Sequence, residues 1–200
     1  MTLGYRENFS PGKAAARSNV YAHLTRKNLY AGKHIVIASE ECGDIKHLLF
    51  LGVKPSNIIA CDVNVKARTA AKELGVIVSP HETIQDTITW AYAKYGKSIV
   101  SVNVDLCMTV KNGAPILNQV LNNISKALTG KDKVKVAFTY LRARDSIQDT
   151  KDNSKRLRYL LNEADLDQDW SLNGAGYNYQ SYTKKSVGSP MSTIVFQPFG

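Results

Sequence analysis

The 200-residue sequence has only three cysteines, and they show neither the spacing of a disulfide framework nor a Cys-x-x-Cys pair. This scarcity favours a reducing, intracellular compartment. No apolar run is long enough to span a bilayer, and the first residues lack the apolar segment of a signal peptide. We therefore expect a soluble protein of the cytoplasm with no membrane partner.

Acidic residues are outnumbered, which gives a formal charge of +9. The charge favours anionic partners such as nucleic acid, but a cationic face in solvent would explain it equally well because no polybasic block is present. Internal repeats and low-complexity tracts are absent as well. With 44% hydrophobic residues, the chain can form one domain with an ample core. We expect this domain over residues 33–200, preceded by an arm and a covering helix over residues 1–32.

The most informative stretch runs from residue 33 to residue 64. It opens with a short apolar run over residues 34–38, followed by an acidic turn with one glycine and by an amphipathic segment over residues 44–51. This pattern predicts a strand, a turn and a helix. Gly52 favours the geometry of a helix end, and Pro55 prevents the helix from continuing.

A second apolar run, residues 57–61, ends on Asp62. Two buried parallel strands joined by a helix form a βαβ unit, whose strands end at the same edge of the sheet. An acid at the tip of the second strand is placed to accept hydrogen bonds from ribose hydroxyls. The stretch therefore predicts a nucleoside-type cofactor.

The rest of the chain alternates between helical and extended patterns. Helices are predicted over residues 13–30, 65–74, 83–95, 114–128 and 153–165, and strands over residues 76–79, 98–104 and 133–141. Residues 177–182 and 191–197 alternate apolar or aromatic with polar side chains on either side of a turn, which predicts an antiparallel hairpin.

This order of elements resembles class I S-adenosylmethionine-dependent methyltransferases, and more narrowly the small methyltransferase-like proteins of phages and viruses. The resemblance covers about residues 33–197 and rests on the first βαβ unit, Asp62, the strand end at Asp105 and the hairpin. It implies an α/β fold with a Rossmann-like sheet of seven strands, mostly parallel with a C-terminal antiparallel hairpin, and helices on both faces. A viral origin would place the protein in the host cytoplasm.

The resemblance also implies a set of cofactor-binding residues. The loop after the first strand would hold the methionine part of S-adenosylmethionine, Asp62 the ribose, and the end of the third strand would approach the adenine. The residues implied are Ser39, Glu41, Cys42, Gly43, Asp44, Asp62, Val63, His81, Glu82 and Asp105. Where the family has two or three glycines in the loop, this chain has Gly43 alone. Alternatively, His81 is an ordinary polar loop residue, and Glu82 interacts with the dipole of the next helix.

By the same resemblance, Asp105 lies where methyl group and acceptor meet, and it would orient or deprotonate the acceptor. The prolines and aromatic residue of enzymes that methylate base amino groups do not follow it, and Lys111 is expected in a loop before the next helix. The implied substrate contacts are Cys107, Lys111, Arg142 and Arg144. The two arginines could equally pair with nearby acids. Cys107 lacks the Pro-Cys context of a cytosine-carbon methyltransferase nucleophile. No metal site is expected.

The sequence thus predicts an S-adenosylmethionine-dependent methyltransferase, with RNA or DNA as the acceptor favoured by charge. Two alternatives stay open. One is a catalytically inactive viral accessory or structural protein that keeps the fold, and the other is a nucleic-acid-binding protein indifferent to the cofactor.

Overall fold

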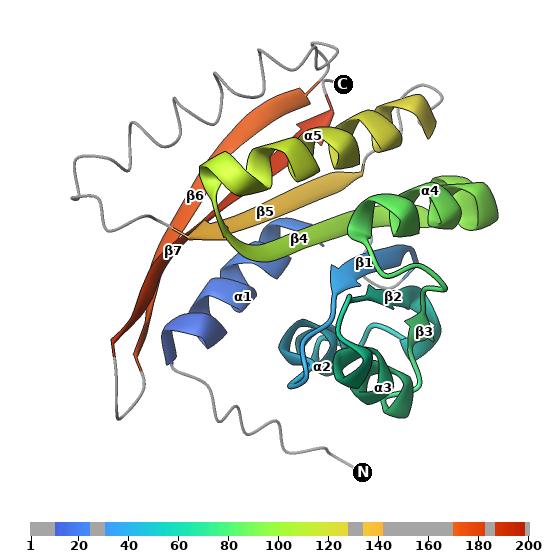
Figure 1. Ribbon diagram of the computed structural model, residues 1–200, viewed down its shortest axis with the longest axis horizontal. Coiled ribbons are helices and arrows are strands. Elements are labelled where there is room, and N and C mark those ends of the chain that lie inside the picture. Colours follow the sequence, from blue (N-terminus) through green and yellow to red (C-terminus); the bar gives the residue numbers. More distant parts are fainter. Residues whose placement is uncertain (1–10, 25–30, 128–133, 142–169, 183–186, 199–200) are drawn as a thin grey trace.

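Seven segments of the chain form one β-sheet (Figure 1). They are β1 (Lys33–Ile37), β2 (Ile58–Cys61), β3 (Ile77–Val78), β4 (Ile99–Thr109), β5 (Lys135–Leu141), β6 (Trp170–Tyr182) and β7 (Val187–Pro198). Their order across the sheet is β3-β2-β1-β4-β5-β7-β6. This computed structural model describes residues 11–24, 31–127, 134–141, 170–182 and 187–198.

The first five strands are parallel, with β1 between β2 and β4. From β1 the chain moves outward to β3, then returns to the other side of β1 to form β4 and β5. The point between β1 and β4 is where the strand order reverses, and open α/β sheets bind ligands at the carboxyl ends of the strands at such a point. β7 runs antiparallel to β5 and to β6, and these two strands contain the segments for which the sequence predicts a hairpin.

Helices cover both faces of the sheet, as the sequence predicts. The apolar side chains of α1 (Pro11–Leu24), α2 (Gly43–Phe50) and α3 (Val65–Glu73) pack on one face, and those of α4 (Ile84–Tyr95) and α5 (Val110–Ala127) on the other. Strand side chains alternate between these two cores: Ile35 belongs to the α4–α5 side and Val36 to the α1–α3 side. None of the described helices has the length and apolar character to cross a membrane.

The short connections between helices and strands form at glycine, proline and asparagine residues. Gly52 and Gly75, with φ of 89° and 74°, end α2 and α3 in the left-handed region that glycine tolerates. A one-turn 3₁₀ helix, η1 (Pro55–Asn57), leads into β2, and another, η2 (Gly96–Ser98), leads into β4. At the start of α3, the side chain of Asn64 accepts a hydrogen bond from the backbone N–H of Lys66.

The predicted end of the fourth strand and the predicted start of the helix that follows it are wrong. The strand does not stop at residue 104 but continues to Thr109, and α5 begins directly at Val110, so that Lys111 lies in a helix and not in a loop. The strand continues because β5 supplies a partner, pairing again at Thr109 after a register shift. Pro115 removes one backbone donor near the start of α5, which costs less than the burial of the apolar face of the helix stabilises.

Some predictions fall outside the described residues. These are the helix over residues 153–165, the C-terminal part of the helix over residues 13–30, and the positions of Arg142 and Arg144. The side chains of Cys107 and Lys111 are also outside the described part, although their backbones lie in β4 and α5. In the described part of its helix, α1 packs in one apolar cluster with α2 and α3.

Candidate functional site

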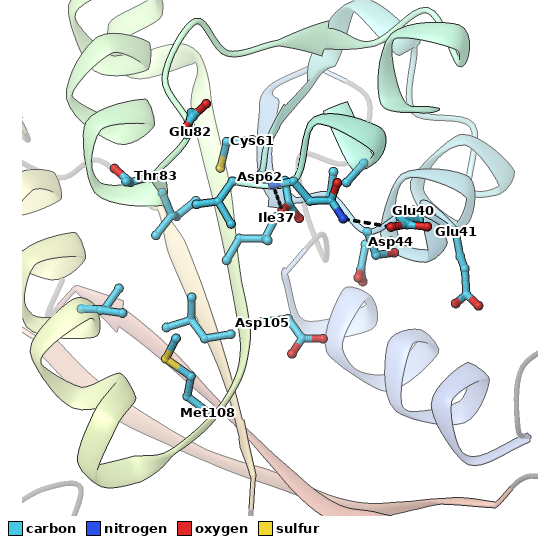
Figure 2. A pocket seen from close by; sticks show the side chains of 18 of the residues that line it. Ile37, Glu40, Glu41, Asp44, Cys61, Asp62, Glu82, Thr83, Asp105 and Met108 are labelled. Carbon is cyan, nitrogen blue, oxygen red and sulfur yellow. Dashed lines mark hydrogen bonds between the residues drawn. The ribbon is translucent and has the colours of Figure 1, made fainter. Parts of the chain in front are cut away.

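A cleft of about 560 Å³ opens at the carboxyl ends of β1, β2 and β4. The turns after β1 and β2 form one side of it, the start of α4 and the end of β4 form the other, and α1 contributes Arg17. Figure 2 shows Glu40, Glu41 and Asp44 on the α2 side, with Asp105 and Met108 across from them. The cleft therefore lies where the topology of the sheet predicts a ligand site.

The turn after β1 is tight and is closed by Cys42. Its backbone N–H and its thiol both donate to the carbonyl oxygen of Ser39, at 2.9 and 3.2 Å. Cys42 has φ 53° and ψ 38°, and among the described residues no other non-glycine has a positive φ. This left-handed geometry is the one that glycine adopts most easily. The bend of a glycine-rich loop is thus present, although a cysteine makes it.

The turn after β2 is tied to the turn after β1. Asp62 Oδ1 accepts a hydrogen bond from the backbone N–H of Asn64 at 2.8 Å, and Asn64 Nδ2 donates to Glu40 Oε1 at 2.9 Å (Figure 2). Asn64 Oδ1 also caps α3. One asparagine therefore fixes the distance between the two acidic turns and the orientation of the Asp62 carboxylate.

Arg68 connects the turn after β2 to the residues before α4. Its Nη1 donates to the carbonyl oxygen of Asp62 at 2.8 Å and lies 2.8 Å from Glu82 Oε1. Thr83, not Glu82, is the N-cap of α4, since its hydroxyl accepts from the backbone N–H of Asp86. His81 is exposed and is not among the residues that line the cleft.

A buried polar network joins α1, α2 and β4 beneath the cleft. Asn103 Nδ2 donates to Tyr21 Oη at 3.2 Å and to Asp44 Oδ1 at 3.3 Å, and Arg17 Nε lies 3.4 Å from the same carboxylate oxygen. Burial, together with the charge of Asp44, raises the pKa of Tyr21 well above its usual value. Tyr21 therefore stays neutral, and the network fixes α1 beside the cleft.

The lining is strongly acidic in a basic chain. Six carboxylates line the cleft, and the described part of the chain has only two others, Glu73 and Asp86. The six are Glu40, Glu41, Asp44, Asp62, Glu82 and Asp105. Arg17 is the one basic side chain among the described lining residues. Although no three acidic, histidine or cysteine side chains in the described ranges are grouped to hold a metal ion, the summed charge favours a cationic ligand.

Two thiols lie at the carboxyl ends of the strands. Burial raises the pKa of Cys61 to about 12, and burial also raises the pKa of Cys42. Both thiols are therefore protonated at neutral pH, and neither is activated as a nucleophile. Cys61 lines the cleft, and Cys42 is buried behind it.

The structure brings together most of the residues that the sequence singles out. Those that line the cleft are Ser39, Glu41, Asp44, Asp62, Val63, Glu82 and Asp105. Cys42 and Gly43 are buried behind it. Sequence reasoning missed Glu40, Asn64 and Arg17 as site residues. The pattern Asp62-x-Asn64 just before a helix would have indicated Asn64 as a cap, but no local signal identifies Arg17.

No protein-family model and no curated protein matches this sequence. Solved structures do match. One is the N-methyltransferase NodS from Bradyrhizobium japonicum WM9 in complex with S-adenosyl-L-homocysteine, with a TM-score of 0.56 and 10% identity over 97% of this chain and 91% of that chain. Another is an rRNA methylase from Streptococcus thermophilus, with a TM-score of 0.51 and 13% identity over 94% of this chain and 97% of that chain.

The chain has a class I methyltransferase fold. The two similar structures share this fold although only 10% and 13% of their residues are identical to those of this chain. The narrower likeness to phage and viral methyltransferase-like proteins stays a prediction that these similar structures do not support. Because a fold hosts many activities, the activity must be argued from the cleft itself.

Proposed function

We propose that this protein binds S-adenosylmethionine in the acidic cleft and transfers its methyl group to an acceptor. The observation that carries the proposal is the placement of Asp62: it ends β2, lines the cleft and is held there by Asn64. A carboxylate at this strand end is suited to the two hydroxyls of a ribose. The proposal draws further support from the methyltransferase fold.

The cleft also fits the charge and size of this cofactor. S-adenosylmethionine carries a positive sulfonium and a positive ammonium group against one carboxylate, and six carboxylates line the cleft. A dinucleotide with a pyrophosphate would meet repulsion from the same lining. The volume of about 560 Å³ lies within the range of small-molecule sites, roughly 300–1,000 Å³.

Within the proposal, the residues of the cleft divide into two groups. Asp62 holds the ribose, with Val63 and Glu82 toward the base, while Ser39, Glu41 and Asp44 hold the methionine end, with Cys42 and Gly43 shaping the turn. The bound cofactor supplies an electrophilic methyl group. Asp105 lies at the end of the cleft beside Leu106 and Met108, and it orients or deprotonates the acceptor. Placement of the acceptor in line with the methyl group supplies much of the rate.

A nucleic acid is the acceptor that we propose. The chain carries a formal charge of +9 although its cleft is acidic. Among the basic side chains that the structure describes, Arg17 alone lines the cleft, so the others lie outside it, where phosphates can bind. One of the similar structures is an rRNA methylase. Cys107, Lys111, Arg142 and Arg144 remain the proposed acceptor contacts.

Calorimetric titration with S-adenosylmethionine tests the cofactor site. The Asp62→Asn variant keeps the acceptor oxygen for the Asn64 N–H but removes the charge, and we expect it to bind at least 10-fold more weakly; Asp62→Ala should abolish binding. Affinity equal to that of the wild type in both variants would exclude the assigned role of Asp62.

Transfer is tested by incubating the protein with labelled cofactor and, separately, RNA, DNA and mixed proteins. Label in RNA or DNA that disappears in Asp105→Asn supports the full proposal. A second candidate function is a methyltransferase fold without catalysis, favoured by the missing proline-aromatic segment after Asp105. Cofactor binding without transfer to any acceptor would favour it, and salt-sensitive nucleic-acid binding without cofactor binding would indicate a pure nucleic-acid binder.

A further inference from the structure

We propose that Arg17 selects ligands that carry a carboxylate at their amino-acid end, and that Arg17 and Asp44 together bind the carboxylate and the ammonium of that end. The inference rests on the proposed function, and it assigns a specificity role to a residue of α1, which precedes the βαβ unit. Its basis is the position of Arg17 in the cleft.

Arg17 is set in the cleft by the packing of α1. Val20, Tyr21 and Leu24 of this helix are buried in the core shared with α2 and α3, and the Tyr21 hydroxyl accepts a hydrogen bond from Asn103 on β4. One turn earlier, Arg17 faces the start of α2 and lines the cleft. Because α1 packs against α2 and α3 and its Tyr21 hydroxyl is bonded to β4, the guanidinium of Arg17 is held beside the turn after β1.

The guanidinium lies directly against Gly43. A Cβ atom built on Gly43 would stand 2.5 Å from both Cζ and Nη2 of Arg17, so only glycine leaves room for this approach. The next residue, Asp44, lies 3.4 Å from Arg17 Nε, and the two side chains are 15% and 13% exposed. Gly43 thus creates the space in which a positive and a negative group lie side by side at the methionine end of the cleft.

The charges explain why this pair matters. The ligand's carboxylate would enter a cleft lined by six carboxylates, and like charges at short range oppose binding. A guanidinium presents paired donors in the plane that a carboxylate requires. Asp44, oriented by Asn103, is placed to accept the ammonium group. The pair therefore matches a zwitterion, whereas the remaining lining would favour a ligand without the carboxylate.

Two ligands distinguish recognition of the ligand's carboxylate by Arg17 from a general effect of Arg17 on binding. S-adenosylmethionine and its decarboxylated form differ by one carboxylate, and both are titrated calorimetrically into the wild type and Arg17→Met. We expect the variant to bind S-adenosylmethionine roughly 10- to 100-fold more weakly and to bind the decarboxylated ligand within about 3-fold of the wild type. Arg17→Lys should fall between, since an ammonium keeps the charge but not the planar pair of donors.

Two further variants control for charge and for position. Lys54→Met removes one positive charge at an exposed site just before η1, and it should leave both affinities unchanged. Gly43→Ala keeps every charge but displaces the guanidinium, so it should lower the preference for S-adenosylmethionine over the decarboxylated ligand. Thermal denaturation of each variant verifies that it is folded.

The outcomes distinguish this inference from the proposed function. If the wild type binds neither ligand, the proposed function is wrong and the inference fails with it. If the wild type binds S-adenosylmethionine but Arg17→Met binds both ligands as the wild type does, or loses both equally, the function stands and the role of Arg17 is overturned.

Discussion

Asn64 and Glu40 join the two acidic turns of the cleft, with Asn64 Nδ2 2.9 Å from Glu40 Oε1. The two residues follow different strands and are 24 positions apart in the sequence. Because Asn64 also caps α3 and donates its backbone N–H to Asp62, one side chain and its own amide couple the turns to the proposed ribose site. The shape of this side of the cleft therefore depends on a neutral donor at position 64.

Replacing Asn64 by aspartate tests this coupling. Aspartate caps helices as well as asparagine does, so α3 should be unaffected, but a carboxylate would now face Glu40. We expect a loss of about 1 kcal/mol in the free energy of unfolding at pH 7, measured by urea denaturation. Adding Glu40→Gln restores a donor and should recover the loss; a double variant no more stable than Asn64→Asp would contradict the contact.

Two substitutions at Cys42 measure its backbone geometry. Alanine and glycine both remove the thiol that donates to Ser39, but only glycine adopts φ 53° without steric strain. An L-residue in this region costs about 1–2 kcal/mol. Chemical denaturation should therefore show Cys42→Gly to be about 1 kcal/mol more stable than Cys42→Ala. Equal stabilities would show that the turn is not left-handed at this position.

Gly113 tests the start of α5. A Cβ atom there would come within 2.7 Å of Phe138 Cζ, and because Phe138 is fully buried, its ring can shift only by displacing its neighbours. Overpacking of this kind costs about 1–3 kcal/mol, which exceeds the helix propensity that alanine adds. We expect Gly113→Ala to lower the melting temperature.

The neighbouring exposed Asn112 provides the matched control for that substitution. Asn112→Ala should leave the melting temperature unchanged or raise it, because alanine favours the helix. Combining Gly113→Ala with Phe138→Leu should recover part of the loss. If residue 113 lay in a loop, as the sequence predicts, both alanine variants would behave alike.

The buried thiol of Cys61 should make the free energy of unfolding depend on pH. Burial raises the pKa of its thiol from 9.0 to about 12, so the folded state retains the proton that the unfolded chain releases. The stabilisation is complete below pH 9 and is lost as the pH rises from 9 toward 12. Unfolding free energy should accordingly fall above pH 9, and less steeply in Cys61→Ala.

The same thiol should resist alkylation. Iodoacetamide at pH 8, followed by peptide mass spectrometry, should leave Cys61 unmodified in the folded protein and modify it in urea. Rapid modification without denaturant would show that the thiol is accessible and that its position at the buried end of β2 is wrong.

Local patterns predicted the parallel strands and the helices that follow them. The period of the apolar residues and the length of each run distinguish strand from helix. Gly52 and Gly75 favour a helix end whatever the tertiary structure. The same patterns misjudged the end of β4, because its last residues are strand only through pairing with β5. They also could not show that His81 does not line the cleft, since a sequence shows that a residue follows a strand but not the direction in which its turn leads.

By itself, the sequence determined that Asp62 ends a buried parallel strand, and hence that it lies at the ligand edge of the sheet, because the direction of parallel strands is a local consequence of their connections. Only the tertiary structure decided that Arg17 enters the cleft, that Cys42 takes the geometry of a glycine and that most described acids gather in one place. These features depend on which face of α1 packs and on how two turns meet, and contacts between distant residues have no periodicity to reveal them.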